Sequence, residues 1–348
     1  MVQAEPCPTV YVVGAYIPNG GTWMAYHIGR ILHEEWGYPM VVVRVDAETP
    51  DLGVFHYEPV FPVLPLDALE ASITARDILV CNPSFSDHAF GLRLPPCRKI
   101  SYVQDYKTFG LLDRFFDLYV SVGDFVQDFL RRTYDLPTEI IPPFISPPDV
   151  RSEAWDTRPA MSLVISSKGP PALLGPMEAK LRAILREKAP EAEAAIDWRG
   201  AVLQQDGKIS HRAFCERLAQ SRYCLSLTPA EGFGLIPLEA MALGAVVFGF
   251  DGFGGRHYFR RGRNSLVRPY PDLEGVADDL ITLLGDDALG ARLSAAGRDV
   301  AADYGYDRFR CAWVRYFTEI LGPPLPRSES KRGQEIRIEA LHHGCEGA

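Results

Sequence analysis

The chain has 348 residues, a formal net charge of -9 at pH 7 and a hydrophobic content of 47%. This length predicts two domains, because single cores stop growing at about 250 to 300 residues. The negative charge argues against nucleic acid as a partner, since such binding relies on many Lys and Arg contacts to phosphates. No apolar run approaches the ~20 residues that a bilayer-spanning helix needs.

Cysteine usage and the first residues indicate the compartment. Seven cysteines are scattered without a C-x-x-C pair, which fits neither a disulfide framework nor a zinc site. The first 16 residues lack the basic segment and the long apolar stretch of a signal peptide. We therefore expect reduced thiols and a cytoplasmic protein.

Short β-branched runs alternate with helical patterns in the first part of the chain. Continuous apolar runs suit strands that are buried on both faces, and their alternation with helices favours a parallel sheet. A helix is expected after the first run, capped by Thr22 and ended by Gly37. The expected strands lie within 9–15, 39–45, 77–82, 99–104, 117–122 and 138–142.

A proline cluster at 142–148 and the polar stretch after it predict a linker between two domains, 1–147 and 148–305. Strand-like runs then recur within 161–166, 195–199, 223–227, 245–250 and 264–268, which predicts a second doubly wound α/β domain. An aromatic, amphipathic helix at about 306–322 is expected to cross to the first domain. Residues 323–348 lack apolar periodicity and are expected to form a mobile tail.

The run "YCLSL" is followed by the loop "TPAEGFG" and by "LIPLEAMALG". The last segment predicts a helix with Pro237 in its first turn and Gly244 just after its end. Such strand-loop-helix units bind anions, typically phosphate, at the helix N-terminus. Ionised carboxylates are acceptors for adjacent sugar hydroxyls. We therefore interpret Glu231 and Glu239 as part of a binding site in which one glutamate binds a ribose and the other binds a second sugar. A diphosphate would lie between the two sugars.

The stretch from Glu231 to Gly244 resembles the E-x7-E signature of retaining GT-B glycosyltransferases of the family 4 type. The resemblance extends over most of the chain. "NGGTWMAYHIGRIL" resembles the first glycine turn and helix of that family, "VSVGDFVQDFL" its sixth-strand region, and the end of the chain its closing helix. It implies two Rossmann-like α/β domains that face an interdomain cleft.

The resemblance also implies roles for matching residues. Glu239 would bind the ribose of the nucleotide, Glu231 would lie beside the donor sugar, and Lys168 would neutralise the diphosphate. Gly254 and Gly255 resemble a later glycine turn near the donor. Contacts with the sugar, diphosphate or base would come from Gly20, Gly21, Gly200, Gly232, Phe233, Gly234 and Leu235.

Two departures from the family pattern stand out. The arginine expected near Lys168 is a serine here, Ser166 or Ser167, and the usual histidine after the fourth strand corresponds to Gln104. An amide side chain cannot act as a general base. In this family the leaving phosphate is commonly described as the proton acceptor, so Gln104 and Asp105 are expected to position hydroxyls and are, with Glu231, the catalytic candidates.

The resemblance implies transfer of a hexosyl or deoxyhexosyl unit from a nucleoside diphosphate sugar to a hydroxyl, with retention and without a metal or a separate cofactor. The expected acceptor is a glycan, a lipid-linked intermediate or a small natural product, as in polysaccharide biosynthesis. Two alternatives stay open: a non-catalytic sugar-nucleotide-binding subunit of a transferase complex, and a nucleotide-sugar epimerase. Peripheral contact with the inner face of a membrane is also open.

For several basic side chains, the sequence allows both a ligand-binding role and a structural or solvent-exposed role. His27 and His88 could face a ligand or be structural. The arginine run 256–268 could contact diphosphate, an anionic acceptor or anionic lipid, or form a solvated face.

Overall fold

The structure is a computed structural model that describes residues 7–17, 19–45, 55, 57–147, 149–200 and 210–324. The chain divides into two α/β units. Unit 1 comprises Met1–Val122, Leu130–Ile141 and Asp307–Ala348, and unit 2 comprises Gly123–Phe129 and Pro142–Tyr306. The domain bounds expected from the sequence, 1–147 and 148–305, differ in detail from this division and remain predictions. Most of the expected tail, residues 325–348, lies outside the described residues.

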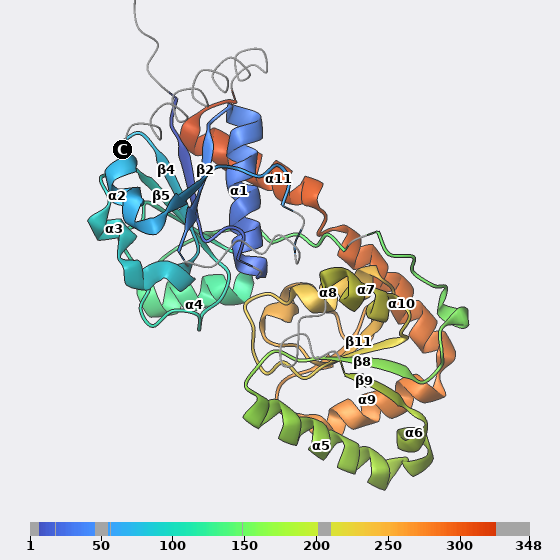
Figure 1. The fold of residues 1–348 in the computed structure, drawn as a ribbon. Helices are drawn as coiled ribbons and strands as arrows, with labels where there is room; N and C mark the ends of the chain where they lie inside the picture. Colours follow the sequence, from blue (N-terminus) through green and yellow to red (C-terminus); the bar gives the residue numbers. More distant parts are fainter. Residues whose placement is uncertain are drawn as a thin grey trace, which may run out of the picture. The chain divides into compact units, whose positions relative to one another are not determined.

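Unit 1 contains a parallel sheet of seven strands in the order β3-β2-β1-β4-β5-β6-β7 (Figure 1). Each of the six runs expected from the sequence overlaps a strand, and only β5 extends beyond its run, by one residue. The additional strand, β3, was missed because it has three residues, exposed ends and a terminal proline. The strands are β1 Val10–Val13, β2 Met40–Arg44, β3 Val63–Pro65, β4 Ile78–Cys81, β5 Arg98–Val103, β6 Leu118–Ser121 and β7 Glu139–Ile140.

Helix α1, Gly20–Trp36, follows β1 and shows how local sequence sets its ends. Asn19 is its N-cap, and the Oδ1 atom of Asn19 accepts a hydrogen bond from the backbone N–H of Thr22 at 2.9 Å. The prediction that Thr22 caps the helix is therefore wrong, because Thr22 is the capped residue. Gly37 ends the helix in the left-handed region at φ 70°, which confirms its expected role.

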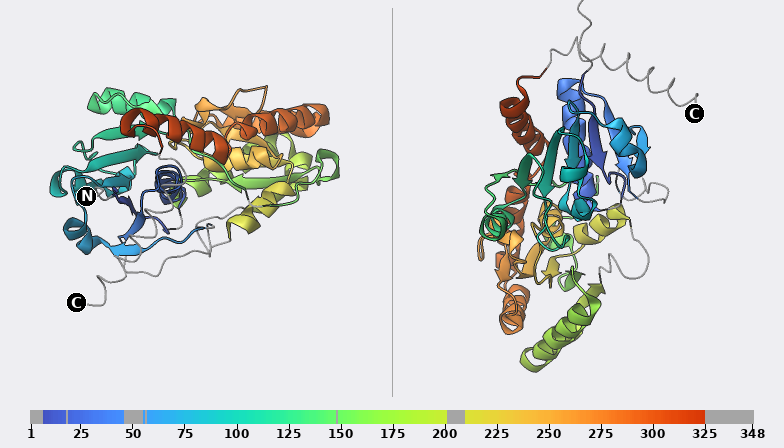
Figure 2. Two further views of the ribbon diagram at one scale, coloured as in Figure 1. Left: turned by 90° about the horizontal axis from the view of Figure 1, so that it is seen from above. Right: turned by 90° about the vertical axis from the view of Figure 1, so that its left-hand side faces the viewer.

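All of the last helix, α11 (Tyr306–Leu321), except its first residue belongs to unit 1 (Figure 2). The rings of Trp313 and Phe317 are buried, and they lie 5.4 Å from the ring of Tyr102 and 5.9 Å from the ring of Trp36, respectively. Trp36 Nε1 also donates to the carbonyl oxygen of Gly322 at 3.2 Å. Unit 1 also holds α2, Leu69–Ser72, and α3, Phe90–Arg93, while α4, Asp124–Tyr134, runs across the division.

Unit 2 contains a parallel sheet of five strands in the order β12-β11-β10-β8-β9. Each of the five runs expected from the sequence overlaps one of them. Apolar residues of β8, β10, β11 and β12 belong to the core, whereas β9 contributes Trp198, which packs against it. The strands are β8 Ser162–Ser166, β9 Asp197–Gly200, β10 Tyr223–Ser226, β11 Val246–Phe250 and β12 Leu266–Arg268.

Helices cover both faces of the second sheet: α5 and α9 lie on one face, and α7, α8 and α10 lie on the other (Figure 1). They are α5 Pro171–Lys188, α6 Pro190–Ala195, α7 His211–Ala219, α8 Leu235–Ala242, α9 Leu273–Gly285 and α10 Asp287–Ala302. Two Rossmann-like α/β units confirm the predicted fold class. Within the described residues, every helix is too short or too polar to cross a membrane.

Candidate functional site

The loop between β10 and α8 forms the centre of the candidate site. Helix α8 starts at Leu235 with Pro237 in its first turn, and Gly244 follows its end at φ 81°, as the sequence predicts. Gly234 precedes the helix at φ 96°. A Cβ atom there would lie 2.6 Å from Tyr258 Oη and 2.9 Å from Glu231 Oε1, so both the backbone and the available space require glycine.

Glu231 is held by a neighbouring loop through its main chain. Its N–H donates to the carbonyl oxygen of Gly252 at 2.9 Å, and the N–H of Gly254 donates to the carbonyl oxygen of Glu231 at 3.2 Å. Tyr258 Oη donates to the carbonyl oxygen of Gly234 at 2.7 Å. Burial, and secondly the charge of Glu231, raise the pKa of Tyr258 well above 10, so its phenol remains a donor. These contacts fix the loop that carries Gly232 and Phe233.

Glu239 lies in α8 and is buried, with 8% of its surface exposed. His211 Nε2 lies 2.7 Å from Glu239 Oε1. His211 is the first residue of α7, and Ser210 caps this helix by accepting from Ala213 N–H at 3.2 Å. Burial opposes protonation of His211, but the hydrogen bond and charge of Glu239 outweigh it and raise its pKa above 6.5.

The same place brings together three groups of the metal-ligand type. Ligand atoms of His211, Cys215 and Glu239 lie within 4.8 Å of one another. Two ligands of one tetrahedral zinc ion are separated by about 3.3 Å, given bonds of about 2.0–2.1 Å. The 2.7 Å between His211 and Glu239 is a hydrogen-bond distance instead. Burial also raises the pKa of the Cys215 thiol, so the arrangement favours an imidazole–carboxylate pair.

Strand β8 lies next to β10 in the sheet, and β9 lies next to β8. Lys168 follows β8, its side chain is exposed, and its N–H donates to Thr228 Oγ1 at 2.9 Å, which joins the two loops. Ser167 Oγ is buried and has no hydrogen-bond partner among the described residues. Gly200 ends β9 and pairs in register with Ile165 of β8. The topology therefore brings Lys168 and Gly200 to the same edge of the second sheet as the glycine loop.

A separate group of carboxamides lies in unit 1, after β4 and β5. Gln104 Nε2 donates to the carbonyl oxygen of Gly21 at 2.9 Å. A Cβ atom on Gly21 would lie 3.1 Å from Gln104 Oε1 and 3.6 Å from Asn82 Nδ2. Asn82 is buried, and its Oδ1 accepts from Ser84 N–H at 2.9 Å. Sequence reasoning missed Asn82, although a polar residue at the end of the buried run 77–82 was a usable signal.

Two other residues expected in this region have local contacts. Gly20 is the first residue of α1 and so lies beside Gly21. Asp105 is buried, and its Oδ1 accepts from the N–H of Tyr106 at 2.7 Å. This contact orients the Asp105 carboxylate within its own loop, and the expected role of Asp105 in positioning a hydroxyl stays a prediction.

The two histidines left open by the sequence pack against aromatic rings. His27 is buried, and its ring lies 4.3 Å from Trp23 and 5.0 Å from Tyr26. Burial, and secondly the charge of Arg30, lower the pKa of His27 to about 3. His88 stacks on Phe90 at 5.2 Å. These contacts favour the structural reading, above all for His27, which is neutral at physiological pH.

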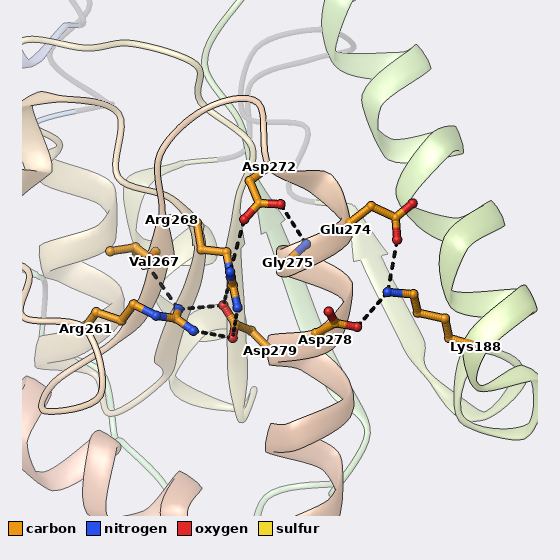
Figure 3. Close-up of polar contacts among 9 residues, drawn as sticks. All are labelled: Lys188, Arg261, Val267, Arg268, Asp272, Glu274, Gly275, Asp278 and Asp279. Carbon is orange, nitrogen blue, oxygen red and sulfur yellow. Dashed lines mark hydrogen bonds and ion pairs between the residues drawn. The ribbon is translucent and has the colours of Figure 1, made fainter.

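Two arginines of the run, Arg261 and Arg268, converge on one internal carboxylate (Figure 3). Arg261 and Arg268 each make two hydrogen bonds to the buried Asp279, at 2.6 to 3.0 Å. Arg256 Nε donates to Asp251 Oδ2 at 2.7 Å. The charges of Arg261 and Arg268 converge on Asp279, which argues against a ligand-binding role for these two side chains, and Arg261 is also 43% exposed to solvent.

Comparisons with known proteins find a family match in the sequence of unit 2 and a similarity of fold that includes both units. Residues 208–300 match the family described as "Glycosyl transferases group 1". This segment contains α7, α8 and the loop between β10 and α8. A phosphatidyl-myo-inositol mannosyltransferase from Mycobacterium tuberculosis is 33% identical over 104 residues, which cover 29% of this chain and 28% of that relative. The chain matches less than a third of the length of its first curated relatives.

Solved structures extend the similarity to the whole fold. Sucrose-phosphate synthase from Thermosynechococcus elongatus superposes on this chain with a TM-score of 0.67 at 12% identity. The superposition covers 90% of this chain and 99% of the synthase chain. TarM from S. aureus, solved with UDP, fondaparinux and alpha-GlcNAc-glycerol, has a TM-score of 0.57 at 15% identity, over 72% of this chain and 57% of that chain. The fold is GT-B.

Proposed function

We propose that the chain is a glycosyltransferase of the retaining family 4 type. It transfers a hexosyl or deoxyhexosyl unit from a nucleoside diphosphate sugar to an acceptor hydroxyl, without a metal ion. One observation carries the proposal: the matched segment 208–300 holds two carboxylates, Glu231 and buried Glu239, on either side of a glycine loop at a helix N-terminus. That arrangement supplies acceptors for sugar hydroxyls and amide donors for a diphosphate.

Each group has a role that follows from its chemistry. We assign the ribose diol to Glu239, the donor sugar to Glu231, and the diphosphate to Lys168 and the backbone N–H groups of 232–235. The buried hydroxyl of Ser167 is a further donor for phosphate, because an unpaired buried hydroxyl gains a hydrogen bond there. Stabilising the negative charge that develops on the departing diphosphate is the main catalytic contribution.

In unit 1, Gln104 is proposed to position a hydroxyl, with Asn82 beside it. An amide cannot take up the proton of the acceptor hydroxyl, so the leaving phosphate accepts it. Asp105 is proposed to position a hydroxyl together with Gln104. The proposed acceptor is a glycan, a lipid-linked intermediate or a small natural product. Similarity to a mannosyltransferase and to TarM, which was solved with UDP, supports a sugar nucleotide as the donor.

A non-catalytic sugar-nucleotide-binding subunit is the second candidate. Gln104, in place of the family histidine, and serine, in place of the arginine near Lys168, favour it. Such a subunit would bind a nucleotide but would show neither transfer nor slow donor hydrolysis when alone. Incubation with labelled donor sugars and chromatography of the products separates this candidate from the enzyme and also detects an epimer.

The donor site is tested first by thermal and chemical unfolding with UDP, GDP, dTDP, ADP and CMP. One diphosphate at about 100 times its dissociation constant should stabilise the wild type by about 2.7 kcal/mol. Glu239→Gln keeps the shape and removes the charge, and it should lose at least tenfold in affinity. Glu216→Gln is the matched control, because Glu216 lies on the neighbouring α7 and pairs with Arg212 on the surface. Equal losses in both variants would contradict the role of Glu239.

Glu231→Gln tests the second carboxylate. Its side chain is proposed to contact the sugar and not the nucleotide, so turnover should fall at least tenfold while the dissociation constant of the nucleoside diphosphate changes less than twofold. Steady-state transfer kinetics and nucleotide titration measure the two quantities. Unchanged turnover in this variant would remove Glu231 from the mechanism.

A further inference from the structure

His211 is a polar side chain beside the proposed donor site, and no motif in the sequence indicates its role. Its ring nitrogen Nε2 lies 2.7 Å from the carboxylate of Glu239, a residue 28 positions away. We propose that His211 is a positioning residue, which holds the Glu239 carboxylate in the orientation that recognises both hydroxyls of a ribose. This inference rests on the proposed role of Glu239.

The geometry allows the Glu239 carboxylate to contact His211 and a diol at the same time. His211 contacts Oε1, and a carboxylate has about four lone-pair positions, so Oε2 and the second lone pair of Oε1 are left for a diol. A glutamate side chain has three rotatable bonds. A link from a second helix reduces the rotamer freedom that a ligand would otherwise have to remove. A diol needs both hydroxyls aligned at once, so it benefits most from this constraint.

The place of His211 is itself well defined. The Ser210 cap fixes the first turn of α7, and one turn later Cys215 Sγ lies 3.6 Å from His211 Nε2. Glu239 is nearly enclosed, and a buried carboxylate without a hydrogen-bond donor is strongly disfavoured. His211 thus stabilises the ionised acceptor and also orients it.

The experiment compares ligands as well as variants. Dissociation constants of UDP and 2′-deoxy-UDP, and of GDP and 2′-deoxy-GDP, are measured by calorimetry on the full chain. The wild type should prefer the ribonucleotide of its own base by about tenfold. His211→Phe keeps the ring volume without a donor, and His211→Asn is too short to reach Oε1, so both should reduce the preference to about twofold or less. His211→Gln retains a donor at the reach of Nε2 and should restore most of it.

The controls separate positioning from general damage. In the Glu239→Gln background, His211→Phe should change neither dissociation constant by more than twofold, because the two residues act through one contact. His33→Gln is the matched control: His33 is a partly buried histidine of unit 1 with its Nδ1 2.8 Å from Tyr38 O, and its loss should leave the ribose preference unchanged.

Two results would overturn the inference in different ways. If both His211→Phe and His211→Asn keep the ribose preference while Glu239→Gln loses it, His211 is not a positioning residue and the proposed function stands. If the wild type binds none of these nucleotides and none of dTDP, ADP and CMP, the proposed function fails and the inference fails with it. A preference that Phe and Asn abolish and Gln restores supports the inference, because lost packing alone would weaken ribose and deoxyribose ligands equally.

Discussion

Gly254→Ala is expected to lower the free energy of unfolding by about 3 kcal/mol and to abolish nucleotide binding. A Cβ atom on Gly254 would lie 2.4 Å from both the carbonyl carbon and the oxygen of Gly232, and 2.6 Å from the carbonyl oxygen of Glu231. These are backbone atoms, which cannot rotate away as a side chain can. The glycine loop would have to move off its neighbour, and Glu231 and the amides after it would move with it.

Urea unfolding measures the stability of this variant, and nucleotide titration well below the transition measures binding. Gly175→Ala is the matched control in unit 2, because a Cβ atom there meets nothing within 4 Å and the residue lies inside α5. Alanine in a helix interior is favoured over glycine, but Pro176 follows directly and disfavours a Cβ atom on the helical residue before it, so this control should change stability by less than about 1 kcal/mol. A stable Gly254→Ala variant that still binds its nucleotide would show that the loop does not depend on this close approach.

The fold could be predicted because its strands carry an unusually clear signal. Strands covered by helices on both faces are continuous apolar runs, and those in 39–45, 161–166 and 245–250 are of this kind. Strand β3 carries no such signal, since it lies at the sheet edge and ends in a proline. Thr22 was misread as a cap because its hydroxyl is of the capping type, whereas the oxygen that caps α1 comes from Asn19, three residues earlier.

Site residues that are close together in the sequence could be predicted, whereas contacts between residues far apart in the sequence could not. The glycine loop, Glu231 and Glu239 lie within one strand-loop-helix unit, so their spacing defines them. The pairing of Glu239 with His211 joins two helices, and only the packing of α7 against α8 creates it. Gln104 and Gly21 are likewise 83 residues apart and meet only because their strands belong to one sheet.

The arginine run is a second case in which contacts between distant residues could not be predicted from the sequence. A cluster of positive charge in an acidic chain suggests a ligand, and a sequence cannot show which acidic residue folds against it. Asp279 lies on α9, 18 residues after Arg261, and receives that guanidinium and the one of Arg268 together. Local charge density therefore overestimated the number of cations available to bind a phosphate.

Asp279→Asn should lower the free energy of unfolding at pH 7 by about 2 kcal/mol. Its carboxylate is buried, with 6% of the side chain exposed, and it is the shared partner of two guanidinium groups (Figure 3). Removing one partner of a fully buried pair costs about 3–5 kcal/mol. Arg261 and Arg268 are 43% and 26% exposed, so water compensates part of that loss.

The pH dependence of this difference gives the sharper test. Burial would raise the pKa of Asp279, but the hydrogen bonds and charges of Arg261 and Arg268 outweigh it and hold the pKa below 3.8. A carboxyl whose pKa is depressed on folding contributes stability above its unfolded pKa and loses it as the pH falls through the folded value. The difference between wild type and Asp279→Asn should thus be constant from pH 5 to 7 and shrink below about pH 4.

The neighbouring aspartate supplies the control for this ion pair. Asp278 pairs with Lys188 at 2.7 Å on the surface, with 56% of its side chain exposed, so Asp278→Asn should change stability by less than about 0.5 kcal/mol. Urea unfolding of both variants between pH 3 and 7 makes the comparison. Equal effects at the two positions would mean that Asp279 is only another surface charge. The arginine run would then again be available for an anionic ligand, which its convergence on a buried carboxylate now argues against.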